Sequence, residues 1–201
     1  MDRDRRYNLR SVVGKSRRII EEDITKKLIY YGITKKAAPI PVENLQHLSE
    51  EDKEIKIKLE KAIEKEKCAV TNYQKAVDRY IRHVGFTFIN RIAALRAMEV
   101  RGLITETILR KSEYGGMSLR ERGIHEKNHD LTPDQVLEES LKDAFREVTK
   151  EIKVLFDLES EYSLIFPSNK VLRDIIRLLS DDVTEDDWMQ DDIIGWIYQY
   201  Y

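Results

Sequence analysis

The sequence has few of the residues that build cross-linked, repetitive or membrane-bound proteins. Its single cysteine, Cys68, excludes a disulfide scaffold and a zinc site made of several thiolates. Eight glycines and four prolines in 201 residues exclude collagen-like and linker-like chains. No apolar run approaches the ~20 residues of a membrane span, and the N-terminus lacks the apolar stretch of a secretory signal. We therefore expect a cytoplasmic protein without a membrane partner.

Charge is abundant and unevenly distributed. Charged residues make up 36% of the chain, although its formal net charge is only −2. Residues 1–36 hold eleven bases and five acids, and residues 79–122 hold nine bases and four acids. Residues 180–201 hold seven acids and no base. This asymmetry indicates a basic face for an anionic partner. The alternative is that the charged residues simply occupy the solvent-exposed faces of helices.

Apolar residues recur at intervals of three or four and predict a mainly α fold. We expect helices 5–31 and 50–84 to form a long antiparallel hairpin, with Gly85 ending the second helix. A short helix over 87–101 follows, and a smaller C-terminal cluster begins at residue 133, with helices over 133–156, 169–179 and 185–200. Tyr162 to Phe166 is predicted to form a short strand or a buried extended segment.

Two prolines at positions 39 and 41 favour an extended linker between the first and second helices. We therefore divide the chain into a basic N-terminal helix (1–36), a linker (37–48) and a helical domain (49–201).

One motif suggests metal chemistry. His125, Glu126 and His129 have the H-E-x-x-H spacing that places two imidazoles on one helical face for zinc, with the glutamate as general base. Gly123 and Pro133 leave no long helix for the motif, and its neighbours are polar. We interpret the run as two solvated histidines on a loop and predict no metal site. The disfavoured alternative is that the motif binds zinc and that the protein is a small zinc peptidase.

Other catalytic signatures are missing from the sequence. It contains no phosphate-binding glycine loop and no G-x-S-x-G nucleophile motif. Cys68 has no nearby histidine in the sequence, so we predict an inert thiol. We interpret His83 as a surface or core-edge histidine. We therefore predict no catalytic residue in this chain.

Three stretches resemble the N-terminal region of the PglX-type adenine-specific DNA methyltransferases of bacteriophage-exclusion (BREX) systems. They are FTFINRIAALRAMEVRG at 86–102, YSLIFPSN at 162–169 and DIIGWIYQYY at 192–201. The likeness is good over residues 80–201 and loose over 1–79.

The resemblance implies a large enzyme that transfers a methyl group from S-adenosylmethionine to adenine N6. Such enzymes bind the donor at a glycine-containing strand–helix turn and hold the flipped adenine with an Asn/Asp-Pro-Pro-Tyr/Phe motif. Neither feature occurs here, because all four prolines are isolated. We expect no cofactor in this chain, no activity from the chain alone, and relatives that continue into a catalytic domain beyond residue 201.

The resemblance implies a non-catalytic N-terminal segment of an adenine methyltransferase of a phage-defence or restriction–modification system. We expect it to position DNA through weak, sequence-independent phosphate contacts from Arg82, Arg91, Arg96, Arg101, Arg110 and Lys111. The alternative is that these side chains only brace neighbouring helices.

The aromatic and acidic C-terminal stretch is expected to meet the catalytic domain. The aromatic residues concerned are Trp196, Tyr198, Tyr200 and Tyr201. Other phage-defence proteins are further candidate partners. The alternative function is a stand-alone helical interaction or regulatory protein of such a system.

Overall fold

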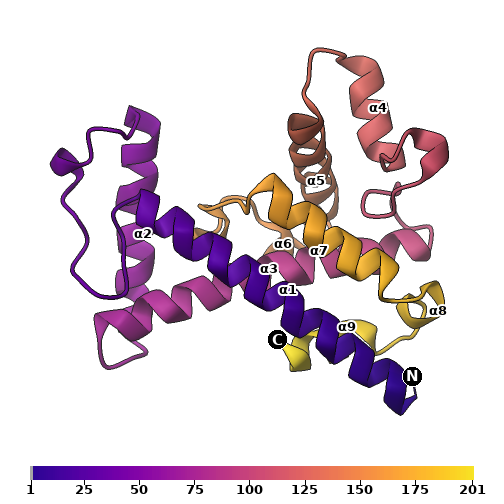
Figure 1. The fold of residues 1–201 in the computed structure, drawn as a ribbon, viewed down its shortest axis with the longest axis horizontal. Coiled ribbons are helices and arrows are strands. Elements are labelled where there is room, and N and C mark those ends of the chain that lie inside the picture. Colours follow the sequence, from indigo (N-terminus) through magenta and orange to yellow (C-terminus); the bar gives the residue numbers. More distant parts are fainter. Residues whose placement is uncertain (1) are drawn as a thin grey trace.

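The computed structural model describes residues 2–201, and these form an all-helical fold without strands (Figure 1). The prediction of a mainly α protein is confirmed. The α-helices are α1 (Arg3–Tyr30), α2 (Glu50–Lys67), α3 (Tyr73–Val100), α4 (Leu119–Lys127), α5 (Pro133–Thr149), α6 (Lys153–Phe156), α7 (Asn169–Asp181), α8 (Glu185–Trp188) and α9 (Ile193–Tyr200). Short 3₁₀ turns occur at Val42–Asn44, Ser112–Tyr114 and Glu161–Ser163. No helix in the described part of the chain is both long and apolar enough for a membrane crossing.

Side-chain caps fix where several helices begin. The hydroxyls of Ser49 and Thr132 accept hydrogen bonds from backbone amides of the first turns of α2 and α5, and reciprocal contacts complete a capping box at each. Ser168 departs from this pattern, because it makes no capping bond within α7. Its hydroxyl instead donates to Asp23 of α1, 2.8 Å away, and so links α7 to α1.

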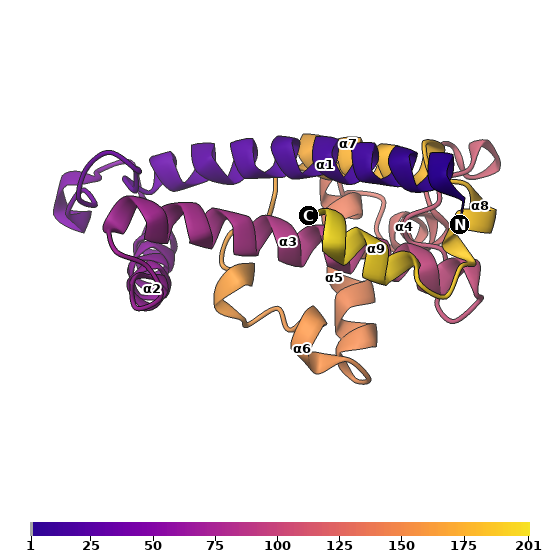
Figure 2. The ribbon, with the colours of Figure 1, turned by 90° about the horizontal axis from the view of Figure 1, so that it is seen from below.

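Helices α1 and α3 pack on each other, and their chain directions are opposed in Figure 2, but Figure 1 shows that they cross obliquely. The predicted hairpin of helices 5–31 and 50–84 is wrong in its second member, because residues 50–84 do not form one helix. That helix is broken at residues 68–72, and Asn72 caps the start of α3 with a bond from the Lys75 amide. Gly85 does not end a helix either, since α3 runs through it without interruption.

The later boundaries also differ from the prediction. Helix 133–156 ends at Thr149 and resumes only as the single turn α6, and helix 185–200 is divided into α8 and α9. Tyr162 to Phe166 contains the end of a 3₁₀ turn and no strand.

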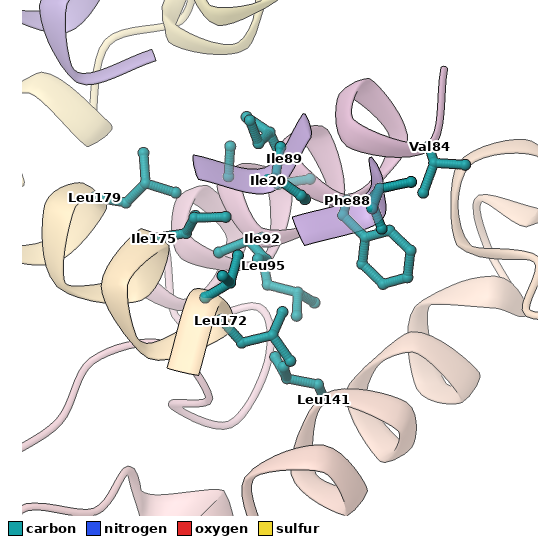
Figure 3. Packing of buried hydrophobic residues seen from close by; sticks show 14 of the residues in the cluster. Ile20, Val84, Phe88, Ile89, Ile92, Leu95, Leu141, Leu172, Ile175 and Leu179 are labelled. Carbon is teal, nitrogen blue, oxygen red and sulfur yellow. The ribbon is translucent and has the colours of Figure 1, made fainter. Parts of the chain in front are cut away.

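One hydrophobic core joins α1, α3, α5 and α7 (Figure 3). Ile20 of α1 lies over α3, and Phe88, Ile92 and Leu95 of α3 face side chains of the later helices. The labelled partners from α5 and α7, all fully buried, are Leu141, Leu172, Ile175 and Leu179. Helix α1 therefore shares its core with the rest of the chain.

Candidate nucleic-acid interface

Arg91 of α3 is fully buried and braces the chain around residues 155–163. Its Nε donates to the Leu155 carbonyl at 2.6 Å, and its Nη2 donates to the Asp157 carbonyl at 2.8 Å and the Ser163 hydroxyl at 2.9 Å. Its guanidinium carbon lies 5.3 Å from the ring centroids of Phe88 and Phe145. Burial lowers the pKa of Arg91 to about 10, so the group remains charged at neutral pH.

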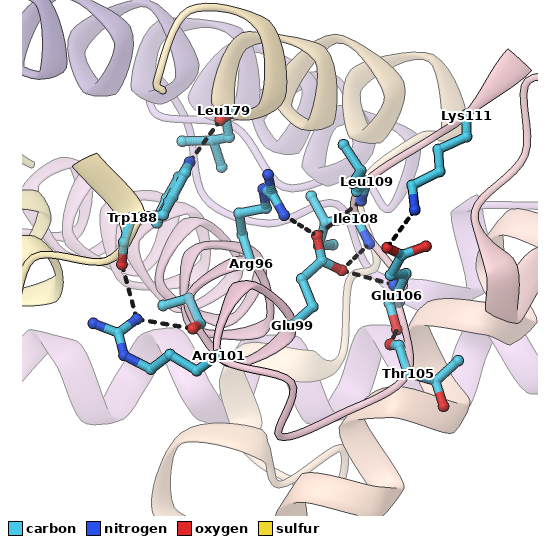
Figure 4. A network of polar contacts seen from close by, with 12 residues as sticks. Arg96, Glu99, Arg101, Thr105, Glu106, Ile108, Leu109, Lys111, Leu179 and Trp188 are labelled. Atoms are coloured by element: carbon cyan, nitrogen blue, oxygen red, sulfur yellow. Dashed lines mark hydrogen bonds and ion pairs between the residues drawn. The ribbon is translucent and has the colours of Figure 1, made fainter. Parts of the chain in front are cut away.

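Arg96 and Glu99 form a second buried group, which fixes the chain that follows α3 (Figure 4). The Glu99 carboxylate accepts from Arg96 Nη1 at 2.9 Å. It also accepts from three successive backbone amides, those of Thr107, Ile108 and Leu109, at 2.7, 2.8 and 2.9 Å. A carboxylate with four donors is well compensated for its burial.

Two further arginines also have internal partners. Arg101 donates to the carbonyls of Trp188 at 2.8 Å and Gln190 at 3.2 Å, and so ties the end of α3 to α8. Arg110 forms an ion pair with buried Glu121 of α4. For Arg91, Arg96, Arg101 and Arg110 the structure favours the bracing alternative over phosphate contact.

The other two predicted phosphate contacts differ in their surroundings. Lys111 pairs with Glu106 at 2.7 Å, and this hydrogen bond raises the pKa of the lysine. Arg82 is exposed on α3 and has no ion pair within residues 2–201.

Arg82 lies on a shallow groove between α1 and α3 that is lined by five cationic side chains and three carboxylates, of which Glu22 is exposed and forms no ion pair in the described part of the chain. Arg18 and Lys26 of α1 line the same groove, are exposed, and have no carboxylate partner in the described part of the chain. Arg17 and Lys35 also line it, but they pair with Glu21 and Asp78. Arg18 and Lys26 were not among the phosphate contacts predicted from the sequence, although the excess of basic residues in 1–36 pointed to this part of the chain.

The aromatic C-terminus packs mostly on its own chain. The Tyr201 hydroxyl donates to Glu21 at 3.1 Å, and Arg17 donates to the Tyr201 carbonyl oxygen at 2.5 Å. Burial, reinforced by Glu21, raises the pKa of the Tyr201 phenol. Trp196 stacks on Tyr200, with centroids 5.9 Å apart.

Tyr198 is the C-terminal aromatic residue most open to solvent. Its side chain is 64% exposed, and its ring lies edge-on to Phe86 with centroids 5.1 Å apart. Among the predicted interface residues, it is therefore the one best placed to meet another surface.

The acidic stretch lies against the basic N-terminal half of α1. Arg5 pairs with Asp187 at 3.3 Å, and Lys15 lies 4.0 Å from Asp182. The side-chain amide of Asn8 also donates to the Asp182 carbonyl at 2.5 Å. The oppositely charged ends of the sequence therefore partly neutralise each other.

Gly85 permits the close packing of Tyr201 on α3. A Cβ at this position would overlap the Tyr201 hydroxyl oxygen and lie 3.0 Å from Cγ2 of Ile20. We expect Gly85→Ala to lower the free energy of unfolding by about 1–2 kcal/mol, because overpacking outweighs the helix preference of alanine. In a Tyr201→Ala background most of this cost should disappear, because only the close contact with Ile20 remains. Urea unfolding of the four proteins measures the difference, and an equal cost in both backgrounds would contradict the close-packing explanation.

A buried carboxylate that the sequence did not reveal joins α2 to α3. Glu66 accepts from Arg79 Nε at 2.5 Å and from the Tyr162 hydroxyl at 2.6 Å, and lies 2.8 Å from His83 Nδ1. Burial alone would raise the pKa of Glu66, but the Tyr162 hydrogen bond and the two basic neighbours hold it below its ordinary value. The interpretation of His83 as a core-edge residue fits its half-buried position.

The H-E-x-x-H run is placed differently from the prediction. His125 belongs to α4 rather than to a loop, because Ser118 and Glu121 form a capping box that starts a helix. His129 lies beyond the end of α4, and the two rings meet edge-to-face with centroids 5.4 Å apart. Residues 2–201 contain no group of three or more side chains arranged to hold a metal ion.

The chain is similar to two curated methyltransferases. It is 29% identical over 157 residues to the adenine-specific methyltransferase PglX of Lacticaseibacillus casei (strain Zhang). It is 30% identical over 141 residues to the adenine-specific methyltransferase BrxX of Escherichia coli O9:H4 (strain HS). The matches cover 64% and 60% of this chain but only 13% and 12% of those proteins. No protein-family model and no solved structure matches the chain. The resemblance to a PglX-type region is confirmed.

Proposed function

We propose that this chain is a non-catalytic helical segment of an N6-adenine DNA methyltransferase of a phage-defence or restriction–modification system. Its likeness to PglX and BrxX supports this proposal most directly. The chain spans about one eighth of the length of these relatives, so the methyl transfer itself belongs to the rest of such an enzyme.

The methyl donor is bound outside this segment in our proposal. Enzymes of the kind that the chain resembles bind S-adenosylmethionine at a strand–helix turn, and residues 2–201 form no strand. The residues present therefore do not fit the donor, and we assign them no step of the reaction.

The segment contributes DNA positioning through phosphate contacts on the groove between α1 and α3. Arg18, Lys26 and Arg82 are the cations concerned, because they are exposed and form no ion pair in the described part of the chain, and they outnumber the one unpaired carboxylate of the groove, Glu22. Contacts of this kind release counterions and carry no sequence information, so binding is weak and salt-sensitive. Tyr198, with the neighbouring edge of Phe86, is the proposed contact to the catalytic domain.

Fluorescence anisotropy with a labelled DNA duplex tests the DNA-positioning role. Three phosphate contacts predict a roughly 40-fold loss of affinity between about 50 and about 200 mM salt. We expect charge reversal of Arg18, Lys26 and Arg82 to glutamate to abolish most binding at low salt.

The matched control reverses three exposed lysines that lie elsewhere and have no ion pair, namely Lys58, Lys61 and Lys150. It changes the net charge equally and should retain much more of the affinity. Equal losses from both sets, or no binding of duplex DNA at low salt by the unmodified chain, would refute the proposed surface.

A further inference from the structure

One side of α1 is open to solvent over most of the helix. Its buried side is marked by a row of residues at intervals of four, namely Val12, Ser16, Ile20, Ile24 and Leu28. Residues two positions further along the chain lie about 200° around the helix, and therefore on the opposite side. In Figure 2, α1 runs along the upper edge of the molecule, and no other helix lies above its middle. The side opposite the core is therefore available to a partner.

This open side carries two of the proposed phosphate contacts and ends in an aromatic ring. Arg18, Glu22, Lys26 and Tyr30 follow one another on it at intervals of four, and all four are exposed. Arg82 of α3 shares the groove between α1 and α3 with Arg18 and Lys26. At ~1.5 Å per residue, Tyr30 lies about 6 Å beyond Lys26 along the helix. The row of cations therefore continues to a tyrosine at the end of α1.

A second hollow begins where the cationic groove ends, and Lys26 lines both. This shallow concavity has a volume of about 540 Å³. Its aromatic and apolar walls come from two parts of the chain, Tyr30 and Tyr31 at the end of α1 and Phe166 and Pro167 before α7. A strand that follows the cations of the groove past Lys26 therefore meets flat apolar surface at its next step.

Lys26 supplies the unpaired charge of this concavity. Lys27, which also lines it, donates to the Phe166 carbonyl at 2.6 Å, and the carboxylate of Glu138 pairs with Lys142 at 2.6 Å. Lys26 has no ion pair among residues 2–201. The concavity therefore offers an anionic ligand one free cation beside two tyrosines.

Tyr30 is held in place while much of its surface stays open. Its ring meets those of Tyr31 and His47 edge-to-face, with centroids 5.1 and 5.0 Å apart. Its hydroxyl donates to Asp52 at 3.3 Å, and yet the residue is 45% exposed. Because these contacts already restrict the side chain, little conformational entropy is lost when another flat group packs on it.

We propose that this surface takes single-stranded DNA, with phosphates on Arg82, Arg18 and Lys26 and an unpaired base stacked on Tyr30. The inference rests on the proposed DNA contact and adds a base contact to it. In a duplex the faces of the bases are stacked on each other, whereas an unpaired base is free to pack on an aromatic ring. Such stacking tolerates any base, which agrees with phosphate contacts that carry no sequence information.

Fluorescence anisotropy with three labelled DNA probes of about eight nucleotides tests the base contact. The probes are a single strand, the corresponding duplex, and a single strand of abasic sites, which keeps the phosphates but has no base to stack. We expect the abasic strand to bind about tenfold more weakly than the ordinary strand. Tyr30→Ala should lower the affinity for the ordinary strand about tenfold and change the affinities for the other two probes less than about twofold.

Two further variants distinguish stacking from a change in the fold. Tyr30→Phe keeps the ring without its hydroxyl and should bind the single strand like the unmodified chain. Tyr7→Ala removes another exposed tyrosine of α1, about 35 Å away along the helix, and should have no effect.

The same titrations separate the base contact from the phosphate contacts. An equal loss on all three probes with Tyr30→Ala, or no loss on any of them, would overturn the base contact. Duplex binding that still depends on Arg18, Lys26 and Arg82 would then leave the DNA-positioning role standing. Binding of every probe that is unaffected by charge reversal of these three cations would refute the DNA-positioning surface itself, and the base contact with it.

Discussion

Replacing Arg91 with methionine is expected to lower the free energy of unfolding by about 3 kcal/mol. The change removes the donor of the half-buried Leu155 carbonyl and one of the donors of the Asp157 carbonyl and the Ser163 hydroxyl, which keep a bond to each other. Removing the desolvated guanidinium, whose pKa burial lowers, recovers part of this cost. The loss remains large because an unsatisfied acceptor costs about 1–3 kcal/mol, and because the fully buried Arg91 side chain also packs against the rings of Phe88 and Phe145.

Urea unfolding followed by circular dichroism measures this effect. Arg91→Lys should also destabilise the protein, because one ammonium group cannot reproduce the fork of Nε and Nη2 donors. Arg82→Met is the matched control on the same helix, and its exposed position predicts a change within about 0.5 kcal/mol. A loss below about 1 kcal/mol for Arg91→Met would contradict the bracing role.

The long α3 helix shows how far the sequence specifies the fold. Its apolar spacing marks the buried face, but the spacing continues across residues 68–72 and so hides the break before Asn72. An N-cap asparagine is a weak signal within such a pattern, since tertiary packing decides whether it is used. Gly85 was predicted to end a helix because glycine has a low helix propensity, and tertiary packing overrides this preference too. Its role is to leave room for Tyr201, and this contact between residues more than a hundred positions apart has no signature in the local sequence.

The basic residues show why the candidate site was only partly predictable. Arg82 and Arg91 lie on one helix and cannot be distinguished by residue type, yet one is exposed and the other fully buried. The partners of Arg91 are mainly backbone carbonyls, which leave no signature in the sequence. Exposure of Arg18 and Lys26 likewise follows from the way α1 packs on α3.

Glu99→Gln is expected to be the second strongly destabilising change, with a loss of about 3 kcal/mol in the free energy of unfolding. The carboxylate accepts from Arg96 and from the amides of Thr107, Ile108 and Leu109. A glutamine has nearly the same shape but has one acceptor oxygen in place of two. Its NH₂ group would face donors, and Arg96, with a side chain only 5% exposed, would lose its counter-charge.

The site of this loss should be visible in hydrogen exchange. In the Glu99→Gln protein, the amides of residues 107–109, which donate hydrogen bonds to the Glu99 carboxylate in the unmodified chain, should lose more protection than those of α7. Glu113→Gln is the control in the same connection between α3 and α4, because Glu113 is exposed and makes no ion pair in the described part of the chain. It should change neither stability nor exchange noticeably.

A double-mutant cycle then separates the ion pair from the backbone contacts. Arg96→Met should cost less in the Glu99→Gln background than in the unmodified chain, because Arg96 has already lost its counter-charge there. Equal costs in both backgrounds would show that the carboxylate acts only through the three amides. A Glu99→Gln protein with unchanged stability and unchanged exchange at residues 107–109 would refute the assignment of this carboxylate as the anchor of the connection.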